Sequence, residues 1–324
     1  MTTRFRLYLG GLLLTVFIVA LGACPNRTHA PLRLGTNVWP GYEPLYLARE
    51  LGYFDTAPVT LVEYLSASEV MRAFRNQALE AAALTLDEAL LLLQHQIPIR
   101  VVLVTDISHG GDVILGAPGL AHVTDLVGKR VGVESTALGA YLLSRALELH
   151  GMSLTDLTVA PLEVGEHAAA YKAGKVDAVV TFEPVRSQLL ALGARELFTS
   201  REIPGEIVDV LVVRQAYLDA HPGPVRQVVD GWFRALEYFA AHPKEAANRM
   251  QKRLKLSPED VLKSYDGLRL PDRAENDKLL GGPSPALLSI INRLQEVMLR
   301  KSLLQAAVKL DSIFSAAALR EDPL

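Results

Sequence analysis

Strand-like and helix-like segments alternate along the chain from Leu32 onward, and this order constrains the fold more than any other feature. We expect strands at 32–39, 59–65, 81–85 and 99–106, with helices at 43–54, 67–77 and 86–96 between them. Strands that alternate with crossover helices form a mainly parallel sheet covered by helices on both faces. This part of the pattern therefore predicts one α/β unit.

The pattern then restarts, and the second run predicts a second lobe. Its expected strands and helices follow in the order strand 112–118, strand 129–135, helix 137–150, strand 157–163, helix 166–175, strand 177–184 and strand 206–214. The rest of the chain is expected to be nearly all helical, with a serine cap, a first-turn proline and acids at 257–260. We expect 32–112 and 210–324 to form lobe 1 and 113–209 to form lobe 2. The chain would then cross between the lobes near 112–118 and again near 203–210.

The N-terminus has the features of an exported lipoprotein. Two arginines precede an almost wholly apolar run at 7–21, which suits a signal peptide and is short for a membrane span. The sequence Leu-Gly-Ala-Cys follows, ending at Cys24, the only cysteine of the chain. We expect residues 1–23 to be a lipoprotein signal peptide, Cys24 to be lipidated, and 24–31 to be a tether. The alternative is an uncleaved N-terminal helix with an incidental cysteine.

Charge and composition exclude several functions. Loss of the two arginines in residues 1–23 changes the formal charge from -3 to -5, so no nucleic-acid partner is expected. A lipidated Cys24 leaves no thiol for disulfides, redox chemistry or a cysteine–metal site. The eight histidines are scattered without ligand-like spacing, and no second apolar stretch is suited to a membrane span. We expect no metal site and no cofactor.

Polar and aromatic residues recur just after the expected strands. Parallel sheets bind ligands beyond the carboxyl ends of their strands, and this composition suits a small polar molecule. The candidate ligand-binding residues are Asn37, Trp39, Tyr42, Thr85, Asp87, Ser108, Asp112, Glu134, Ser135, Thr136, Phe182 and Glu183.

Several of these candidates have a purely structural alternative. Trp39 precedes Pro-Gly and is held extended, so its indole could contact a ligand or pack as ordinary core. Ser135 or Thr136 could cap a helix, and Asp87 could favour a first helical turn, without any ligand. Glu183 lies at a strand end, where a capping role is not expected.

Sequence signatures of enzymes are mostly absent. The chain has no GxSxG, HExxH or GxxxxGK[ST] motif, and no GxGxxG after its first expected strand. We therefore expect a protein that is not an enzyme, with no catalytic residues.

Four segments together resemble a known family. The segment 32–54 contains Pro-Leu-x-x-Ala-x-x-x-Gly-Tyr-Phe and is similar to the start of ABC-transporter substrate-binding proteins of the nitrate/sulfonate/taurine and thiamine-precursor group. The stretches 108–112, 126–139 and 174–184 resemble later motifs of that family in the same order. The resemblance covers about 32–240.

The resemblance implies a two-lobed periplasmic binding protein of type II that closes around a ligand by hinge motion. It also implies an ABC permease and ATPase as partners. From the lipidated Cys24 we expect a membrane contact and a location in the periplasm or at the cell surface, and we expect a monomer. It places Trp39, Tyr42, Thr85, Asp87, Ser108, Asp112, Ser135, Thr136 and Glu183 in the pocket.

The ligand class remains open between amine-bearing, sulfonate and pyrimidine-like molecules. No arginine lies in the expected pocket loops, which disfavours a sulfonate, and Asp87, Asp112 and Glu183 favour an amine or another donor. A periplasmic sensor that signals to a membrane receptor is the alternative function. An enzyme on the same scaffold is a third reading, although the related thiamine-pyrimidine synthases have a cysteine-rich motif that this chain lacks.

Overall fold

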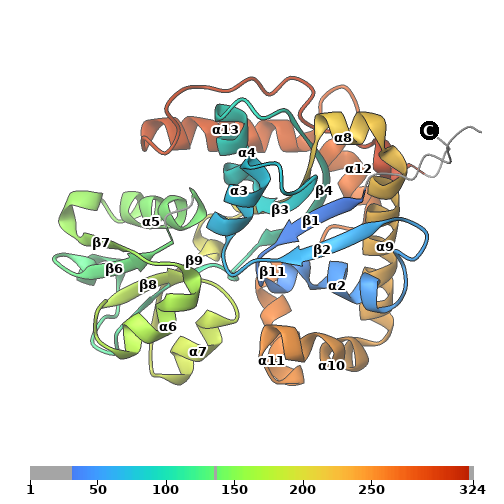
Figure 1. Ribbon diagram of the computed structural model, residues 1–324. Coiled ribbons are helices and arrows are strands. Elements are labelled where there is room, and N and C mark those ends of the chain that lie inside the picture. Colours follow the sequence, from blue (N-terminus) through green and yellow to red (C-terminus); the bar gives the residue numbers. More distant parts are fainter. Residues whose placement is uncertain (1–30, 135–136, 321–324) are drawn as a thin grey trace, which may run out of the picture. The chain divides into compact units, whose positions relative to one another are not determined.

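Two separate β-sheets form the framework of the protein (Figure 1). The computed structural model describes residues 31–134 and 137–320. The first sheet has the strand order β11-β4-β10-β3-β1-β2, with β1 (Leu32–Thr36), β2 (Val59–Glu63), β3 (Ala81–Thr85), β4 (Ile99–Ser108), β10 (Val208–Arg214) and β11 (Leu268–Arg269). The second has the order β7-β6-β8-β5-β9, with β5 (Val113–Gly116), β6 (Arg130–Val133), β7 (Thr158–Pro161), β8 (Ala178–Thr181) and β9 (Arg195–Thr199).

Most strands of each sheet run in the same direction. In the first sheet β1 pairs in parallel with β2 and β3, whereas β10 is antiparallel to both β3 and β4. In the second, β6 pairs in parallel with β7 and β8, and β5 is antiparallel to β8 and β9. The prediction of two mainly parallel α/β lobes is therefore confirmed.

Helices cover both faces of the first sheet. The α-helices of the described residues are α2 (Glu43–Glu50), α3 (Ala67–Arg75), α4 (Leu86–Gln94), α5 (Ala137–Leu149), α6 (Val164–Lys172), α7 (Val185–Ala191), α8 (Gln215–Ala220), α9 (Pro222–Ala241), α10 (Pro243–Leu254), α11 (Pro258–Ser264), α12 (Arg273–Leu280) and α13 (Ala286–Arg300). Figure 1 shows α3 and α4 on one face of this sheet and α2 with α9 on the other. The second sheet is flanked by α5, α6 and α7.

Short 3₁₀ helices complete the connections. They are η1 (Pro40–Tyr42), η2 (Val123–Leu126), η3 (Leu154–Asp156), η4 (Ser200–Glu202), η5 (Tyr265–Gly267) and η6 (Ala317–Leu319). The cap predicted at 257–260 is confirmed, because Ser257 Oγ accepts a hydrogen bond from the Asp260 amide at 3.1 Å. Among the described residues, no helix combines the length and apolar character that crossing a bilayer requires.

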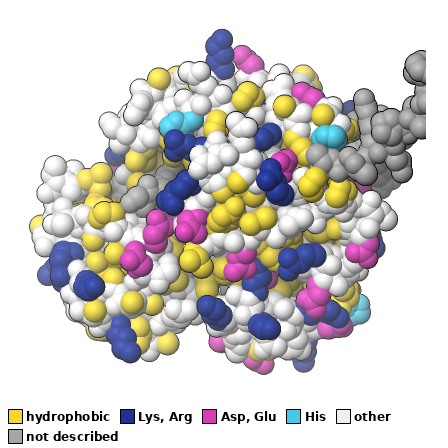
Figure 2. Space-filling model, viewed as in Figure 1, with side chains coloured by type: hydrophobic (Ala, Val, Ile, Leu, Met, Phe, Trp, Pro, Cys, Tyr) yellow, Lys and Arg dark blue, Asp and Glu magenta, His cyan; other side chains and the backbone are white. Residues whose placement is uncertain are grey.

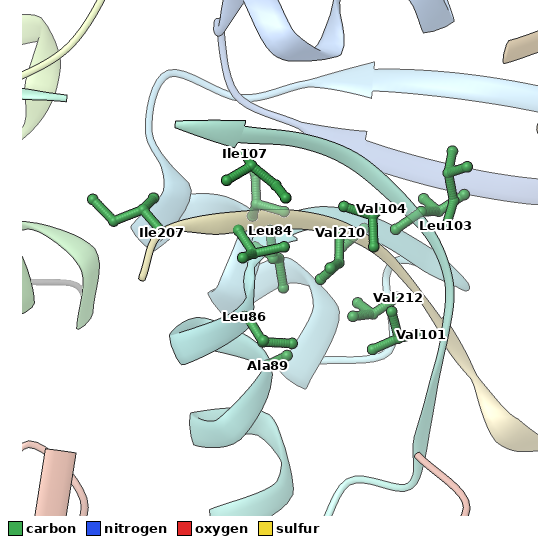
Figure 3. Packing of buried hydrophobic residues seen from close by; sticks show 14 of the residues in the cluster. Leu84, Leu86, Ala89, Val101, Leu103, Val104, Ile107, Ile207, Val210 and Val212 are labelled. Atoms are coloured by element: carbon green, nitrogen blue, oxygen red, sulfur yellow. The ribbon is translucent and has the colours of Figure 1, made fainter. Parts of the chain in front are cut away.

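The core of the first sheet consists of its central strands and the helix α4. Every residue of β3 is buried, and its alanines allow the helices to approach the sheet closely. Figure 3 shows Leu84 of β3 together with Val104 of β4, Val210 of β10 and Leu86 of α4. Burial of such side chains stabilises the fold by about 1.5–3 kcal/mol each. In contrast, Lys and Arg are interspersed with Asp and Glu over the face shown in Figure 2.

Two short segments carry the chain between the sheets. The first joins β4 to β5, and the second joins β9 to β10. They are hydrogen-bonded to each other: Ser108 Oγ lies 2.8 Å from Ser200 Oγ, and the Gly110 amide donates to Ser200 Oγ at 2.6 Å. The Ser200 amide in turn donates to the Asp112 carbonyl at 3.0 Å. We call these two segments, 109–112 and 200–207, the crossing segments.

The structure corrects the sequence expectation in three places. The helix α7 and the strand β9 were not predicted. The C-terminal part is not nearly all helical, because β11 joins the first sheet and residues 301–316 form no helix. This segment returns to β4, where the Val101 amide donates to the Ile313 carbonyl at 2.8 Å. The predicted signal peptide, Cys24 and most of the tether lie outside the described residues.

Candidate functional site

A narrow cavity lies between the two sheets. From the side of the first sheet it is lined by Asn37, Trp39, Tyr42, Ala67, Thr85, Glu88 and Asp209, and from the side of the second by Asp112, Glu134, Leu138, Gly139, Leu142, His167, Val180, Thr181 and Phe182. About 540 Å³ of space around these side chains is not filled by atoms, including space open to solvent, but the centre of a water molecule can occupy only about 30 Å³ of it. The two sides are therefore close together around a space for a small molecule.

The carboxyl ends of the strands bring these residues together. Asn37 follows β1, Thr85 ends β3, Glu134 follows β6, and Phe182 follows β8. Strands that run in one direction place their carboxyl ends at one edge, so loops far apart in the sequence meet there.

Trp39 and Phe182 meet across the cavity. Trp39 is extended at the start of η1 (φ -152°, ψ 132°), as expected for a residue before proline. Its ring lies edge-on to that of Phe182, with the centroids 5.4 Å apart and the planes at 88°. The Trp39 Nε1–H group donates to Asp106 Oδ2 at 3.2 Å. The indole is 4% exposed, so it is both packed and part of the cavity wall.

Two buried carboxyl groups face each other on neighbouring strands behind the tryptophan. Asp106 of β4 pairs directly with Asp209 of β10, and the Tyr42 hydroxyl donates to Asp209 Oδ1. Burial raises the pKa of Asp209 well above its ordinary value, and the charges of Asp106 and Asp112 raise it further. Burial also raises the pKa of Asp106 to about 7. The pair therefore resists double ionisation at neutral pH.

Two further carboxyl groups that line the cavity have an oxygen without a hydrogen-bond partner. They are Asp112, through Oδ2, and Glu88, through Oε1; their residues are 3% and 1% exposed. The other oxygen of Glu88 accepts from the Thr85 amide at 3.1 Å. Burial raises the pKa of Asp112 to about 7 and that of Glu88 well above its ordinary value. A buried carboxyl oxygen without a partner is costly, so such atoms indicate a place for a donor.

Glu134 and His167 line the part of the cavity near the second sheet. The carboxylate of Glu134 reaches across to α3, where it accepts from the Ser68 amide at 3.0 Å and from Ser68 Oγ at 2.8 Å. His167 Nδ1 lies 3.2 Å from Thr181 Oγ1, and burial lowers the pKa of His167 to about 4. The imidazole is therefore neutral at physiological pH.

The described lining residues carry no positive charge at neutral pH. They include four carboxyl groups, a neutral histidine, and no lysine or arginine. In the described part of the chain, no group of three or more His, Cys, Asp or Glu residues is arranged to hold a metal ion. The four carboxyl groups of the wall suit a ligand that donates hydrogen bonds or carries positive charge.

Seven of the residues predicted from the sequence line this cavity. They are Asn37, Trp39, Tyr42, Thr85, Asp112, Glu134 and Phe182. Asp87 is buried in the first turn of α4 and is not among the lining residues; burial raises its pKa to about 6. Ser108 is the last residue of β4, and its Oγ lies 2.8 Å from Ser200 Oγ. Ser135 and Thr136 lie outside the described residues.

The prediction that Glu183 has no capping role is wrong. Its carboxylate is turned to α7, where Oε2 accepts from the Ser187 amide at 3.1 Å and Oε1 from Ser187 Oγ at 3.0 Å. Arg186 Nη1 also donates to it at 3.1 Å. These contacts arise because α7, which the sequence analysis missed, begins two residues later.

Sequence reasoning missed Glu88, His167 and Asp209 as cavity residues. Glu88 directly follows Asp87, a predicted site residue at the end of the strand 81–85, so the same strand-end argument could have included Glu88. Asp209 interrupts an apolar run, Ile-Val-Asp-Val-Leu-Val-Val. Burial of an acid in such a strand is costly, so a single acid there indicates a functional residue. His167 is one of several scattered histidines, and only the fold distinguishes it.

Comparisons with known proteins agree with this architecture. The taurine-binding periplasmic protein of Escherichia coli is 23% identical over 191 residues, which cover 58% of this chain and 59% of that protein. The alkanesulfonate-binding protein SsuA of Xanthomonas axonopodis pv. citri has a similar structure, with a TM-score of 0.72 at 20% identity over 86% of this chain and 96% of that one. The desulfurization enzyme DSZB also has this fold, with a TM-score of 0.64 at 18% identity over 89% of this chain and 97% of that one.

The fold is thus that of periplasmic binding proteins, as the sequence predicted. The chain spans 59% of the length of its taurine-binding relative, and the structural likenesses establish the fold alone. Residues 26–255, well over half of the chain, match a single family. The protein therefore belongs to the NMT1-like family.

Proposed function

We propose that the protein is the solute-binding component of an ABC importer, and that it captures a small polar ligand between two lobes. The observation that carries the proposal is the cavity, which residues of both sheets line together. In this proposal 32–112 and 210–324 form lobe 1, 113–209 forms lobe 2, and the crossing segments are the hinge. Its relatives among periplasmic binding proteins for taurine and alkanesulfonates support the proposal.

Hinge motion explains how a ligand enters so narrow a space. Only about 30 Å³ is open to the centre of a water molecule, which is room for very few waters. Separation of the two sides would admit a ligand, and contacts from both sides would then favour the closed form. The closed form is the species that a permease and its ATPase would recognise.

Ligand binding is favoured over catalysis because relatives of this chain are named as binding proteins for taurine and alkanesulfonates. DSZB shows that this fold also supports an enzyme. Among the described lining residues of this chain, the single histidine is His167, and burial lowers its pKa to about 4. Recovery of the bound ligand in chemically altered form would favour an enzyme.

We further propose that the mature protein is a periplasmic or surface lipoprotein, a monomer anchored to the membrane through Cys24. The apolar run and the sequence Leu-Gly-Ala-Cys support this proposal. Cys24→Ser should move the protein from the membrane fraction to the soluble fraction. Unchanged membrane association of this variant would contradict the lipid anchor.

The transport function is tested by uptake in the native host. The ligand is first identified by extraction from the purified protein, and its uptake is then compared in cells with and without the gene. Wild-type protein should restore uptake, Trp39→Ala should not, and the control Leu192→Ala, which changes an exposed side chain, should. Uptake that does not depend on the gene would contradict transport, and a requirement for the gene only in a ligand-induced response would favour a sensor.

A further inference from the structure

We propose that the cavity selects an organic cation, a compact molecule with a protonated amine or amidine, and that Asp112 and Glu88 bind its positive group. The inference rests on the proposed function, because it names the ligand class of the same cavity. It chooses between cationic and anionic ligands, which the fold and the family do not distinguish.

The two unpartnered carboxyl oxygens are the first step of the argument. Asp112 Oδ2 and Glu88 Oε1 belong to residues that are 97% or more buried and that line the cavity. They approach from different sides, since Glu88 lies on α4 of the first sheet and Asp112 lies in the crossing segment that leads into β5. One ligand with two or three N–H donors could satisfy both oxygens and so connect the two sides.

The charge balance of the wall is the second step. Asp209 and Glu134 add two more carboxyl groups, and the described lining residues offer no lysine or arginine to compensate them. The nearest pairings are hydrogen bonds from neutral donors, from Tyr42 to Asp209 and from Ser68 to Glu134. Buried carboxylates are ordinarily paired with a cation, and here a cationic ligand can provide the missing charge.

The aromatic and aliphatic part of the wall is the third step. Trp39 and Phe182 meet edge-on across the cavity, and Leu138, Leu142 and Val180 add an apolar surface. An aromatic face attracts a cation, and an apolar surface receives the carbon skeleton of an organic molecule. A bare inorganic cation would use neither feature.

An anionic group would find no lysine or arginine among the described residues of the wall. A sulfonate placed among Glu88, Asp112 and Asp209 would add a negative charge to three acidic side chains. Taurine carries both an amine and a sulfonate, so its amine could use the carboxyl groups while its sulfonate could not. A test must therefore separate the two charges.

Matched pairs of small molecules provide that separation. Benzamidine and benzenesulfonate share a phenyl ring but carry opposite charges. Ethylamine and ethanesulfonate share an ethyl chain and also carry opposite charges. Taurine carries both an amine and a sulfonate. Binding to the purified full-length protein is measured by calorimetry and by the shift of the unfolding temperature. We expect benzamidine or ethylamine to bind and to raise the unfolding temperature by several degrees at saturating concentration, with no effect of its sulfonate partner.

Two near-isosteric variants connect the binding to the proposed residues. Asp112→Asn and Glu88→Gln should each weaken binding of the cation about tenfold or more, because a charged acceptor becomes neutral. Asp219→Asn, which removes an exposed acid on α8, is the control and should leave binding unchanged. If only taurine binds, loss of its binding in Asp112→Asn and Glu88→Gln supports the inference, and unchanged binding in both overturns it.

The remaining outcomes separate this inference from the proposed function. Binding of the sulfonates without the cations would overturn the choice of ligand class and leave a solute-binding protein. Absence of binding by every probe would also reject the inference, while the uptake experiment would still decide the transport function. Equal binding of a cation to wild type and to both cavity variants would refute the role of Asp112 and Glu88.

Discussion

The change Asp112→Asn should stabilise the empty protein at alkaline pH and have less effect at acidic pH. Asp112 is 3% exposed, and the acids Asp87, Asp106 and Asp209 interact with it electrostatically. No cationic side chain is among the described residues that raise or lower its pKa. Ionisation of Asp112 in the folded protein is therefore unfavourable, and asparagine removes the need for it.

The magnitude follows from the pKa of Asp112, which burial raises from 3.8 to about 7. Protonated Asp112 contributes to the free energy of unfolding. This contribution is fully present below the pKa of the unfolded state and is lost as the pH rises through the pKa of the folded state. Each unit of pKa difference corresponds to about 1.4 kcal/mol, so the full loss is about 4 kcal/mol. About 3 kcal/mol of it falls between pH 5 and pH 8.

The assay is urea unfolding of wild type and Asp112→Asn, without ligand, at several pH values from 5 to 8. The difference in the free energy of unfolding should change by about 3 kcal/mol across this range, in favour of the variant at pH 8. Any packing cost of the amide is independent of pH and cancels from this change. Parallel pH profiles for the two proteins would refute the argument that Asp112 resists ionisation.

Four further predictions concern other parts of the structure. Glu183→Gln should lower the free energy of unfolding by about 1–2 kcal/mol without weakening ligand binding, because the Glu183 carboxylate accepts a hydrogen bond from the Ser187 amide in the first turn of α7. Thermal unfolding measures the first effect and calorimetry the second. Arg253→Met should cost about 3–5 kcal/mol at pH 8 and less at pH 5, since Arg253 pairs with buried Glu43, whose pKa is about 7. Gly267→Ala should destabilise by about 1–3 kcal/mol in denaturant unfolding, because its Cβ would lie 2.8 Å from the Gly111 backbone nitrogen. Binding of a cation at pH 7 should release protons, seen as binding heats that depend on the ionisation enthalpy of the buffer, and this dependence should be weaker at pH 9, because burial raises the pKa of Asp112 only to about 7.

The general fold could be predicted because the alternation of elements is a local property of the sequence. The strand β3, for example, was predicted at 81–85, where the structure has it, because a short apolar run between two helical segments allows few other interpretations. The helix α7 and the strand β9 were missed because they follow Pro184 in a stretch of mixed composition. The position of β9 depends on its antiparallel pairing with β5, which a local pattern does not reveal.

The candidate site could be predicted only where it lies at strand ends. Asn37, Thr85 and Phe182 were found because parallel strands bring their carboxyl ends to one edge. The pairing of Asp209 with Asp106 could not be found in this way, since the two strands are about a hundred residues apart in the chain and meet only through their antiparallel register. The location of the cavity could therefore be predicted from the order of the strands, whereas its electrostatic character could not, because it depends on which strands pair in the tertiary structure.

The position of Asp112 suggests how charge recognition and hinge motion are coupled. Its carboxyl group lines the cavity, while its backbone carbonyl accepts from Ser200 in the other crossing segment. A cation held by Asp112 and by Glu88 of α4 would connect a crossing segment to an element of the first sheet. Without the cation, the acidic wall favours separation or protonation, because like charges repel in a poorly hydrated space. The same carboxyl groups that destabilise the empty protein would then provide the free-energy difference by which a ligand selects the closed form.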